Sequence, residues 1–293
     1  MDWSKAKNVL IVAFIITNMM LVYVIQKDLF NNGELQLIND DYINNVVAYL
    51  ADNGLEINID IPKEIVSLPV LMVRYKAFDL EEMAKVFLGE NYQIVNEDTY
   101  ISADKKIEKI TSKKFIYTKD PSSENGGYPL DEKEAIKIGR EFLQEYNFMQ
   151  DDLELQQIYF GVVDRFGSMP VYKLVYNQIY KNRFLAESYI HVYVQHQEVI
   201  GLEAMLLEYE KTQGEKKKTI PATEALLRKM NDILVDNKEY DKIRISDMEL
   251  GYYFNTRDVN LTTWDTIASG TAFPSWKIVL DNGKTYYVEA FRN

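Results

Sequence analysis

The residue types that most often perform catalysis or bind metals are scarce in this chain. It contains no cysteine and two histidines, His191 and His196. Residues five positions apart in a strand point to opposite faces of the sheet, so the two imidazoles are not expected to share a metal ion. Without cysteine, disulfides, thiol catalysis and Cys-based zinc sites are excluded. The sequence therefore predicts neither a metal centre nor a histidine-assisted nucleophile.

Carboxylates are abundant, but their positions in the sequence do not define a site. Asp40-Asp41 and Asp151-Asp152-Glu154 are clusters of the residue type that glycosidases use in pairs. Because the chain has 45 acidic residues, such clusters arise easily. A surface hydrolase stays an alternative that requires two carboxylates about 5–10 Å apart in an open cleft. The sequence contains no glycine-rich phosphate loop, nucleophile elbow, HExxH motif or EF-hand loop, so we predict no catalytic residue and no cofactor.

The overall composition is that of a folded, acidic protein. Of the 293 residues, 47% are hydrophobic, which supplies enough apolar surface for packed cores and excludes a disordered chain. The 33 basic residues are outnumbered by 45 acidic ones, and the formal net charge is −12. A surface of this charge repels phosphate backbones, so nucleic acid is not expected as a partner.

One apolar segment near the N-terminus predicts a membrane anchor. Residues 9–25, VLIVAFIITNMMLVYVI, carry no charge and are long enough to cross the hydrocarbon core. Lys5 and Lys7 precede the segment, and such positive residues mark the cytoplasmic side. We expect a cytoplasmic tip at residues 1–7, a single transmembrane anchor at residues 8–26, and export of the remainder. The alternative is a cleaved signal peptide, but no A-x-A-like cleavage site follows the apolar run.

Small and polar residues inside this anchor predict a contact with another membrane helix. Thr17 and Asn18 fall near the middle of the bilayer, where an amide facing lipid leaves strong donors and acceptors unpaired. Ala13 and Thr17 are four positions apart and form a small-xxx-small pair, which allows two helices to approach closely. Ala13, Thr17 and Asn18 are therefore the predicted transmembrane partner interface. The alternative is that a single Asn is tolerated in the helix.

The exported part divides into three regions, of which the first comprises residues 37–120. Within it, Asp79 is expected to cap a helix that ends at Leu88. Alternating segments with polar turns follow from residue 92 and indicate antiparallel strands. The segment 121–127, PSSENGG, is the clearest linker in the chain.

The other two regions, residues 128–210 and 219–293, predict an internal repeat. Three motifs recur: Glu134-Ala135-Ile136 as Glu224-Ala225-Leu226, Gly161 as Gly251, and Pro170-Val-Tyr-Lys-Leu-Val175 as Pro274-Ser-Trp-Lys-Ile-Val279. Each unit is expected to contain a helix followed by antiparallel strands, and Asn282-Gly283 predicts a tight hairpin. Because such units bury a helix face against a sheet, the expected fold class is α+β.

The motifs at both ends of the chain resemble one known family. The opening Met1-Asp-Trp-Ser-Lys5-Ala-Lys7, followed at once by a single membrane helix that carries Asn18, is similar to the start of YycI family proteins. Ile220-Pro-Ala-Thr-Glu-Ala-Leu, Met248-Glu-Leu-Gly-Tyr-Tyr253 and Pro274-Ser-Trp-Lys-Ile resemble the repeat of that family. Members of the family, with the related YycH proteins, are membrane-anchored regulators of the YycG/WalK histidine kinase in low-GC Gram-positive bacteria.

The resemblance implies a protein that is not an enzyme. Such a protein would bind a sensor histidine kinase of the YycG/WalK type and a YycH-type membrane protein, and would alter kinase output for cell-wall metabolism. Its contacts would come from the membrane helix and the adjacent exported domain. The repeat motifs also resemble the broader PepSY-like class. That similarity leaves open an extracytoplasmic binding or protease-inhibitory module for which the helix is a simple tether.

Overall fold

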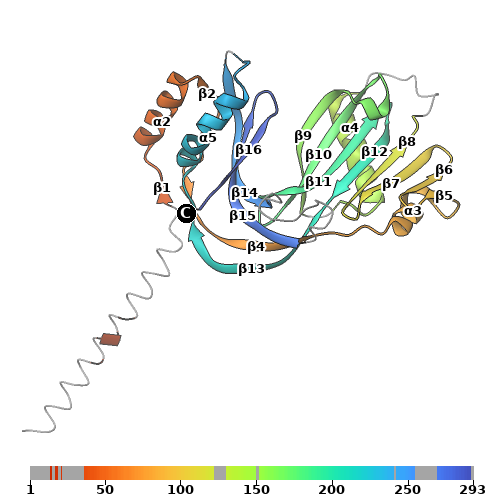
Figure 1. The fold of residues 1–293 in the computed structure, drawn as a ribbon, viewed down its shortest axis with the longest axis horizontal. Coiled ribbons are helices and arrows are strands. Elements are labelled where there is room, and N and C mark those ends of the chain that lie inside the picture. Colours follow the sequence, from red (N-terminus) through yellow and green to blue (C-terminus); the bar gives the residue numbers. More distant parts are fainter. Residues whose placement is uncertain are drawn as a thin grey trace, which may run out of the picture.

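The computed structural model describes residues 36–121, 130–149, 152–240, 242–254 and 269–291, together with Phe14, Thr17, Asn18 and Leu21. From residue 36 onward the chain forms two lobes joined by long strands (Figure 1). The predicted anchor, residues 8–26, lies outside the described residues apart from the four named above. Among the residues that are described, no helix combines the length and the apolar character needed to cross a bilayer.

Within the described ranges, four α-helices follow residue 36, and local capping explains where three of them begin. They are α2 (Asp40–Asp52), α3 (Leu80–Leu88), α4 (Glu132–Glu145) and α5 (Ala222–Asp236). The side chains of Asn39, Asp79 and Asp131 each accept a hydrogen bond from a backbone N–H in the first turn of α2, α3 and α4. Since these N–H groups have no partner within the helix, the caps fix the helix starts. The helix predicted from Asp79 to Leu88 is confirmed.

Almost all strands of the described residues join one sheet of 14 strands, and β1 (Gln36–Leu37) pairs separately with β3 (Glu64–Ile65). Before α4 the large sheet contains β2 (Leu55–Ile57), β4 (Ser67–Tyr75), β5 (Gln93–Asn96), β6 (Thr99–Ser102), β7 (Lys105–Thr111) and β8 (Lys114–Lys119). Between α4 and α5 it contains β9 (Leu153–Val162), β10 (Pro170–Ile179), β11 (Phe184–Gln195), β12 (Glu198–Met205) and β13 (Leu207–Lys218). After α5 come β14 (Ile243–Phe254), β15 (Ser269–Leu280) and β16 (Thr285–Glu289).

The strand order of this sheet is β13-β4-β15-β14-β11-β12-β8-β7-β6-β5. Off this path, β9 pairs with β10, β10 with β11, β2 with β14 and β16 with β15. The pairings are antiparallel except those of β14 with β2 and with β11, which are parallel. The predicted α+β class, a mixed fold with a large antiparallel sheet, is therefore confirmed at the level of secondary structure and pairing.

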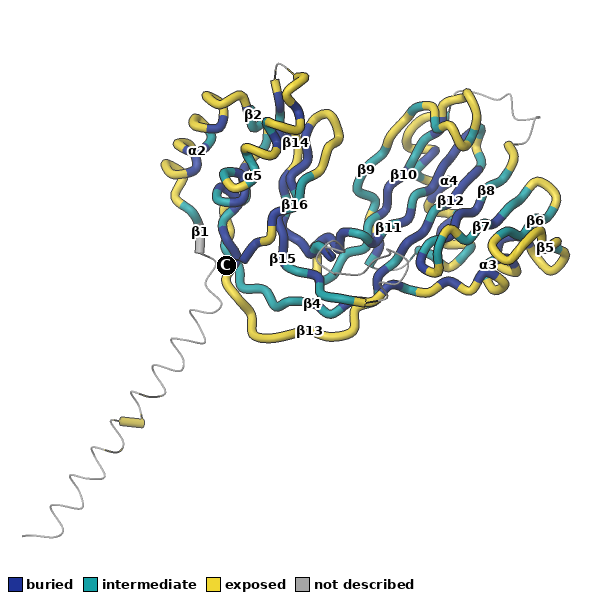
Figure 2. The backbone as a smooth tube through the Cα atoms, in the orientation of Figure 1, coloured by how far each residue is buried: buried dark blue, intermediate teal, exposed yellow. Residues whose placement is uncertain are grey.

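Each lobe has its own hydrophobic core, built from distant parts of the chain. In one lobe, α2 and α5 pack on β2, β14, β15 and β16, and Leu50, Leu226 and Trp276 are buried there. In the other, α3 and α4 pack on the strands from β7 to β12, where Phe87 and Leu143 are buried. Figure 2 shows buried residues of both lobes as dark blue segments of the backbone.

The structure divides the region predicted at residues 37–120 between these two cores. Its first part, from α2 to the start of β4, packs with α5 and the C-terminal strands. Its second part, from α3 to β8, packs with α4 and with β9 to β12. The physical reason is that a short helix with a few short strands buries little apolar surface alone, so each part joins a larger sheet.

A third buried cluster lies where the long strands pass between the lobes. It contains Leu71, Tyr75, Leu207, Tyr252 and Phe254, from β4, β13 and β14. The ring centroids of Tyr75 and Phe254 are 5.5 Å apart. The two lobes are thus joined by packed side chains as well as by continuous strands.

The strand pairs β9–β10 and β14–β15 have the same register. Gly161 of β9 lies opposite Val171, and Gly251 of β14 lies opposite Ser275. The two glycines differ by 90 positions and their partners by 104, and these are the offsets of the motifs found in the sequence.

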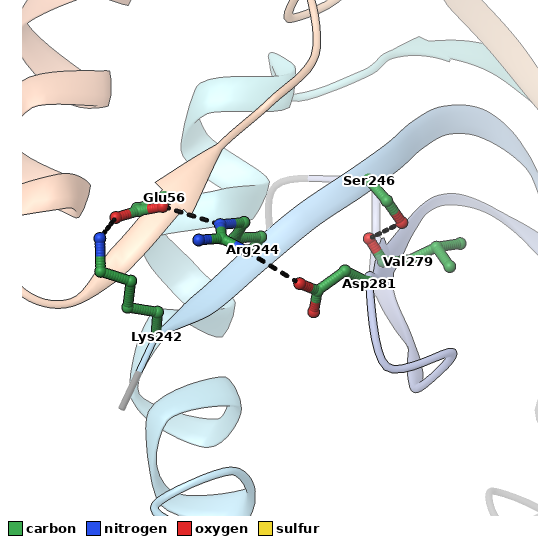
Figure 3. A network of polar contacts seen from close by, with 6 residues as sticks. All are labelled: Glu56, Lys242, Arg244, Ser246, Val279 and Asp281. Carbon is green, nitrogen blue, oxygen red and sulfur yellow. Dashed lines mark hydrogen bonds and ion pairs between the residues drawn. The ribbon is translucent and has the colours of Figure 1, made fainter. Parts of the chain in front are cut away.

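The two pairs also share a β-bulge at the equivalent position. The register skips Gln156 in β9 and Ser246 in β14, which again differ by 90 positions. The hydroxyl of Ser246 donates to the carbonyl oxygen of Val279 at 3.3 Å (Figure 3). A bulge bends its strand and increases the local twist, so β9 and β14 have the same departure from regular pairing.

Candidate functional site

The predicted transmembrane interface is described in part. Thr17 and Asn18 are helical and exposed, whereas Ala13 lies outside the described residues. The side-chain amide of Asn18 donates a hydrogen bond from Nδ2 to the carbonyl oxygen of Phe14, one turn earlier, at 2.8 Å. This bond uses one of the two N–H groups that an Asn amide offers.

The structure does not bring the two histidines together. His191 lies within β11, and His196 lies in the turn between β11 and β12, with a φ of 47°. No group of three or more His, Asp or Glu side chains is arranged to hold a metal ion within the ranges that the structure describes.

The acidic clusters found in the sequence also lie apart. Asp40, at the start of α2, forms an ion pair with Lys63 at 2.5 Å in one lobe. Asp152, just before β9 in the other lobe, accepts a hydrogen bond from Gln178 at 2.6 Å. Asp151 lies outside the described residues.

A polar cluster that sequence reasoning did not single out surrounds Glu203 on one face of the second lobe's sheet. The Oε1 atom of Glu203 lies 2.7 Å from Nζ of Lys114 and 2.9 Å from the hydroxyl of Tyr189, which donates to it. Nδ1 of His191 is 3.8 Å from the same oxygen, and the His191 ring stacks on Tyr189 with centroids 4.3 Å apart. Pairing of β12 with β8 and β11 positions these side chains.

Burial controls the protonation of this cluster. It lowers the pKa of His191 to about 4, with a smaller contribution from the nearby positive charge of Lys173. Burial alone would raise the pKa of Glu203, but the hydrogen bond and charge of Lys114 outweigh it and hold that pKa below its usual value. Burial also lowers the pKa of the Lys173 amine. At neutral pH the cluster therefore contains a carboxylate and an uncharged imidazole.

This arrangement is poorly suited to acid–base catalysis. An imidazole whose pKa is about 4 is a weak base at neutral pH. The carboxylate of Glu203 is already bound by Lys114 and Tyr189. The geometry is that of a satisfied ion pair inside the sheet, which favours a role in positioning strands.

Two cavities adjoin the described elements. One, of about 470 Å³, lies beside α3 and the end of α4 and includes Met83, Val86 and Phe148 in its lining. The other, of about 560 Å³, is bordered by Arg183 and Trp276. In its lining Glu249 forms an ion pair with Lys277, and Nη1 of Arg183 donates to the Leu250 carbonyl at 3.2 Å.

The outer edge of β14 carries a second polar network, shown in Figure 3. Glu56 of β2 accepts hydrogen bonds from Lys242 and from Arg244, each at 2.9 Å. Arg244 also lies 3.8 Å from a carboxylate oxygen of Asp281. These contacts, together with parallel backbone pairing, hold β2 against β14.

Comparison with known proteins gives one family and two similar structures. The family model described as YycI protein matches residues 35–291. An uncharacterized protein from Eubacterium rectale ATCC 33656 aligns with a TM-score of 0.50 and 11% identity, over 86% of this chain and 99% of its own, which is a likeness of fold alone. YycH from Bacillus subtilis aligns with a TM-score of 0.42 and 13% identity, over 78% of this chain and 56% of its own. No curated protein matches the chain.

Proposed function

The chain belongs to the YycI family, and on that premise we propose that it is a membrane-anchored, non-enzymatic regulator of a sensor histidine kinase of the YycG/WalK type. The match from residue 35 to residue 291 is the observation that carries this proposal. In the proposed arrangement, residues 8–26 cross the cell membrane, the N-terminus is cytoplasmic, and the rest of the chain is extracytoplasmic. A YycH-type membrane protein is the second partner.

The membrane helix contacts its partners through Ala13, Thr17 and Asn18. The hydrogen bond from Asn18 to the Phe14 carbonyl occupies one N–H of the amide, and the second N–H and the carbonyl oxygen of an Asn amide are the groups that would contact a partner helix. A polar contact between membrane helices contributes about 0.6–2 kcal/mol, so one Asn adds specificity to a packed interface.

Regulation then follows from a difference in affinity. If the anchor binds the kinase helices more tightly in one signalling state than in the other, it shifts the ratio of the two states by that difference. Coupling free energies of this kind are typically about 1–3 kcal/mol, a change of about 5–150-fold.

The extracytoplasmic part provides a rigid platform for further contacts. We propose that its two C-terminal units, 128–210 and 219–293, are copies of one repeat. The common register and the common bulge of β9–β10 and β14–β15 support this interpretation. The satisfied ion pair at Glu203 and the continuous sheet agree with a structural role for the platform.

The experiment that tests the helix contact is the substitution Asn18→Leu in the full chain, expressed with the kinase and the YycH-type protein. We expect weaker crosslinking to the partners and a changed kinase output. Met19→Leu serves as the control, because helical spacing predicts Met19 on the opposite side of the helix from Ala13, Thr17 and Asn18. Unchanged association and unchanged kinase output in Asn18→Leu would defeat the proposed contact.

Replacement of the whole anchor separates this function from the PepSY-like alternative. An unrelated membrane span in place of residues 8–26 keeps a tether intact but removes a helix interface. We expect loss of kinase regulation after the exchange. Full regulation with the foreign helix would instead favour an extracytoplasmic module that is merely tethered.

A further inference from the structure

Strand β9 is a long outer strand of the sheet with few charges. Within the described residues it pairs with β10 alone, so its other edge presents unpaired backbone groups. Among the other outer strands, β5 has four residues and β16 has five, whereas β13 has twelve with many Lys and Glu side chains. The ten residues of β9, LELQQIYFGV, include one charged side chain, Glu154. Proteins usually protect long edges with charges, so an edge of this kind indicates a partner.

Apolar side chains along β9 are exposed. Phe160 is 63% exposed and Val162 is 59% exposed, and Tyr159 beside them is also exposed. Large apolar side chains that gather at one sheet edge are typical of a surface that another chain covers.

The equivalent edge in the second unit is covered. Strand β14 pairs on its outer side with β2, where Ile243 lies opposite Leu55, and with β11, where Tyr252 lies opposite Leu185. Both pairings are parallel. The common register gives an offset of 90 positions between the two strands. Ile243 of β14 therefore corresponds to Leu153 of β9, and Tyr252 corresponds to Val162.

Charge specifies the strand that fits this edge. Lys242 and Arg244 hold Glu56 at the centre of the covering strand β2 (Figure 3). The same offset places Asp152 and Glu154 at the equivalent positions beside β9. Since the sign of the charge is reversed, the strand that covers β9 carries Lys or Arg where β2 carries Glu.

We propose that the outer edge of β9 binds an extended strand of the YycH-type partner. The strand runs parallel to β9 and carries a basic residue between two apolar residues. It thus has the pattern of Leu55-Glu56-Ile57 with the charge of the central residue reversed. Backbone hydrogen bonds supply affinity, and the side chains at alternate positions supply specificity. This inference rests on the proposed function, which supplies the partner.

The test measures binding of the full-length chain to the full-length YycH-type protein of the same organism, both in lipid nanodiscs. The variant combines Glu154→Lys with Val162→Lys on β9. The control combines Glu97→Lys with Ile94→Lys at β5, where both residues are exposed and the change in net charge is the same. We expect the Kd of the β9 variant to rise about tenfold or more, as for loss of central interface contacts, and the control to bind like the unmodified chain.

A crosslink locates the contact independently. Because the chain has no cysteine, Val162→Cys introduces a single thiol that can carry a photoreactive group. We expect this thiol to crosslink to the YycH-type protein, and the thiol of Ile94→Cys to give no product.

The outcomes separate this inference from the proposed function. If the unmodified chain binds the YycH-type protein and the β9 variant binds it equally well, the edge is not the docking surface and the proposed function stands. Equally weakened binding in the β9 variant and in the control would also show that the β9 edge is not the docking surface. If the β9 variant loses only self-association, the occupant is a second copy of this chain. Failure of the unmodified chain to bind overturns the proposed partner, and this inference with it.

Discussion

Single residues in the second lobe have protonation states that their environment decides. His191 and Glu203 lie opposite each other on β11 and β12. Burial lowers the pKa of His191 to about 4, so the imidazole is neutral although a carboxylate is near. The charge of Glu203 is retained because Lys114 and Tyr189 bind it. Lys114 lies closer to the carboxylate than His191 does, and it therefore supplies the positive charge that pairs with Glu203.

This environment makes stability depend on pH through His191. In the unfolded chain the pKa of a histidine is about 6.5, so between that value and about pH 4 the unfolded state binds more protons than the folded state. Stability is therefore lost on acidification through this window, by about 1.5 kcal/mol between pH 6.5 and pH 5. The lowered pKa of Glu203 acts only at lower pH, since its contribution is lost as pH falls below the usual carboxyl range. We expect His191→Phe, which keeps a ring on Tyr189, to remove this loss.

The measurement is urea unfolding of the full chain in detergent at pH 7, 6 and 5. His196→Asn is the matched control, because Asn tolerates the positive φ of that turn. An unchanged dependence of the unfolding free energy on pH in His191→Phe would contradict the prediction.

Strands β9 and β14 share one register with their partners but differ in what packs on them. Gly161 in β9 and Gly251 in β14 occupy the same position of the common geometry. A Cβ atom at Gly251 would lie 2.3 Å from a ring carbon of Phe184, whereas a Cβ at Gly161 would meet nothing within 4 Å. The difference arises because β14 is covered by neighbouring elements and β9 lies at an edge.

The paired substitutions Gly251→Ala and Gly161→Ala test this difference. Phe184 is buried and its ring cannot move freely, so Gly251→Ala is expected to cost about 1–3 kcal/mol by overpacking. Gly161→Ala is expected to change stability by less than about 0.5 kcal/mol, as for an open surface site. Thermal unfolding of the two full-length variants provides the comparison. Equal effects would show that the two positions have the same surroundings.

The two cores are connected through the third buried cluster, which lies where the long strands pass between the lobes. Phe254 is buried there, packs against Tyr75, and fills the space above Gly270, where an added Cβ would lie 2.4 Å from its ring. Strands β4, β14 and β15 continue from this cluster into the lobes. Loosening the cluster is therefore expected to affect both lobes.

Phe254→Ala is the substitution that tests this coupling. Removal of a buried phenyl ring costs about 3–5 kcal/mol. We expect amide hydrogen exchange to accelerate in α5 of one lobe and in α4 of the other. An exposed substitution, Val235→Ala, is the control and should leave both unchanged. Faster exchange confined to one lobe would show that the cores open independently.

Features that depend on neighbouring residues are readable from the amino-acid sequence alone. Asp79 caps α3, and Gly283, with a φ of 82°, forms the hairpin turn between β15 and β16, as the sequence predicts. Helix caps and tight turns involve residues two to four positions apart, so their signals are complete within a short segment. The family motifs were readable for the same reason, since each is a short run of residues.

The folded structure was needed to establish which distant segments lie together. It divided residues 37–120 between two cores, paired Lys114 with Glu203, and covered β14 while β9 has no second partner strand among the described residues. None of these outcomes has a local signal, because strand pairing between distant segments depends on the apolar surface buried by the whole sheet. Two segments with the same pattern, such as β9 and β14, can therefore have different neighbours.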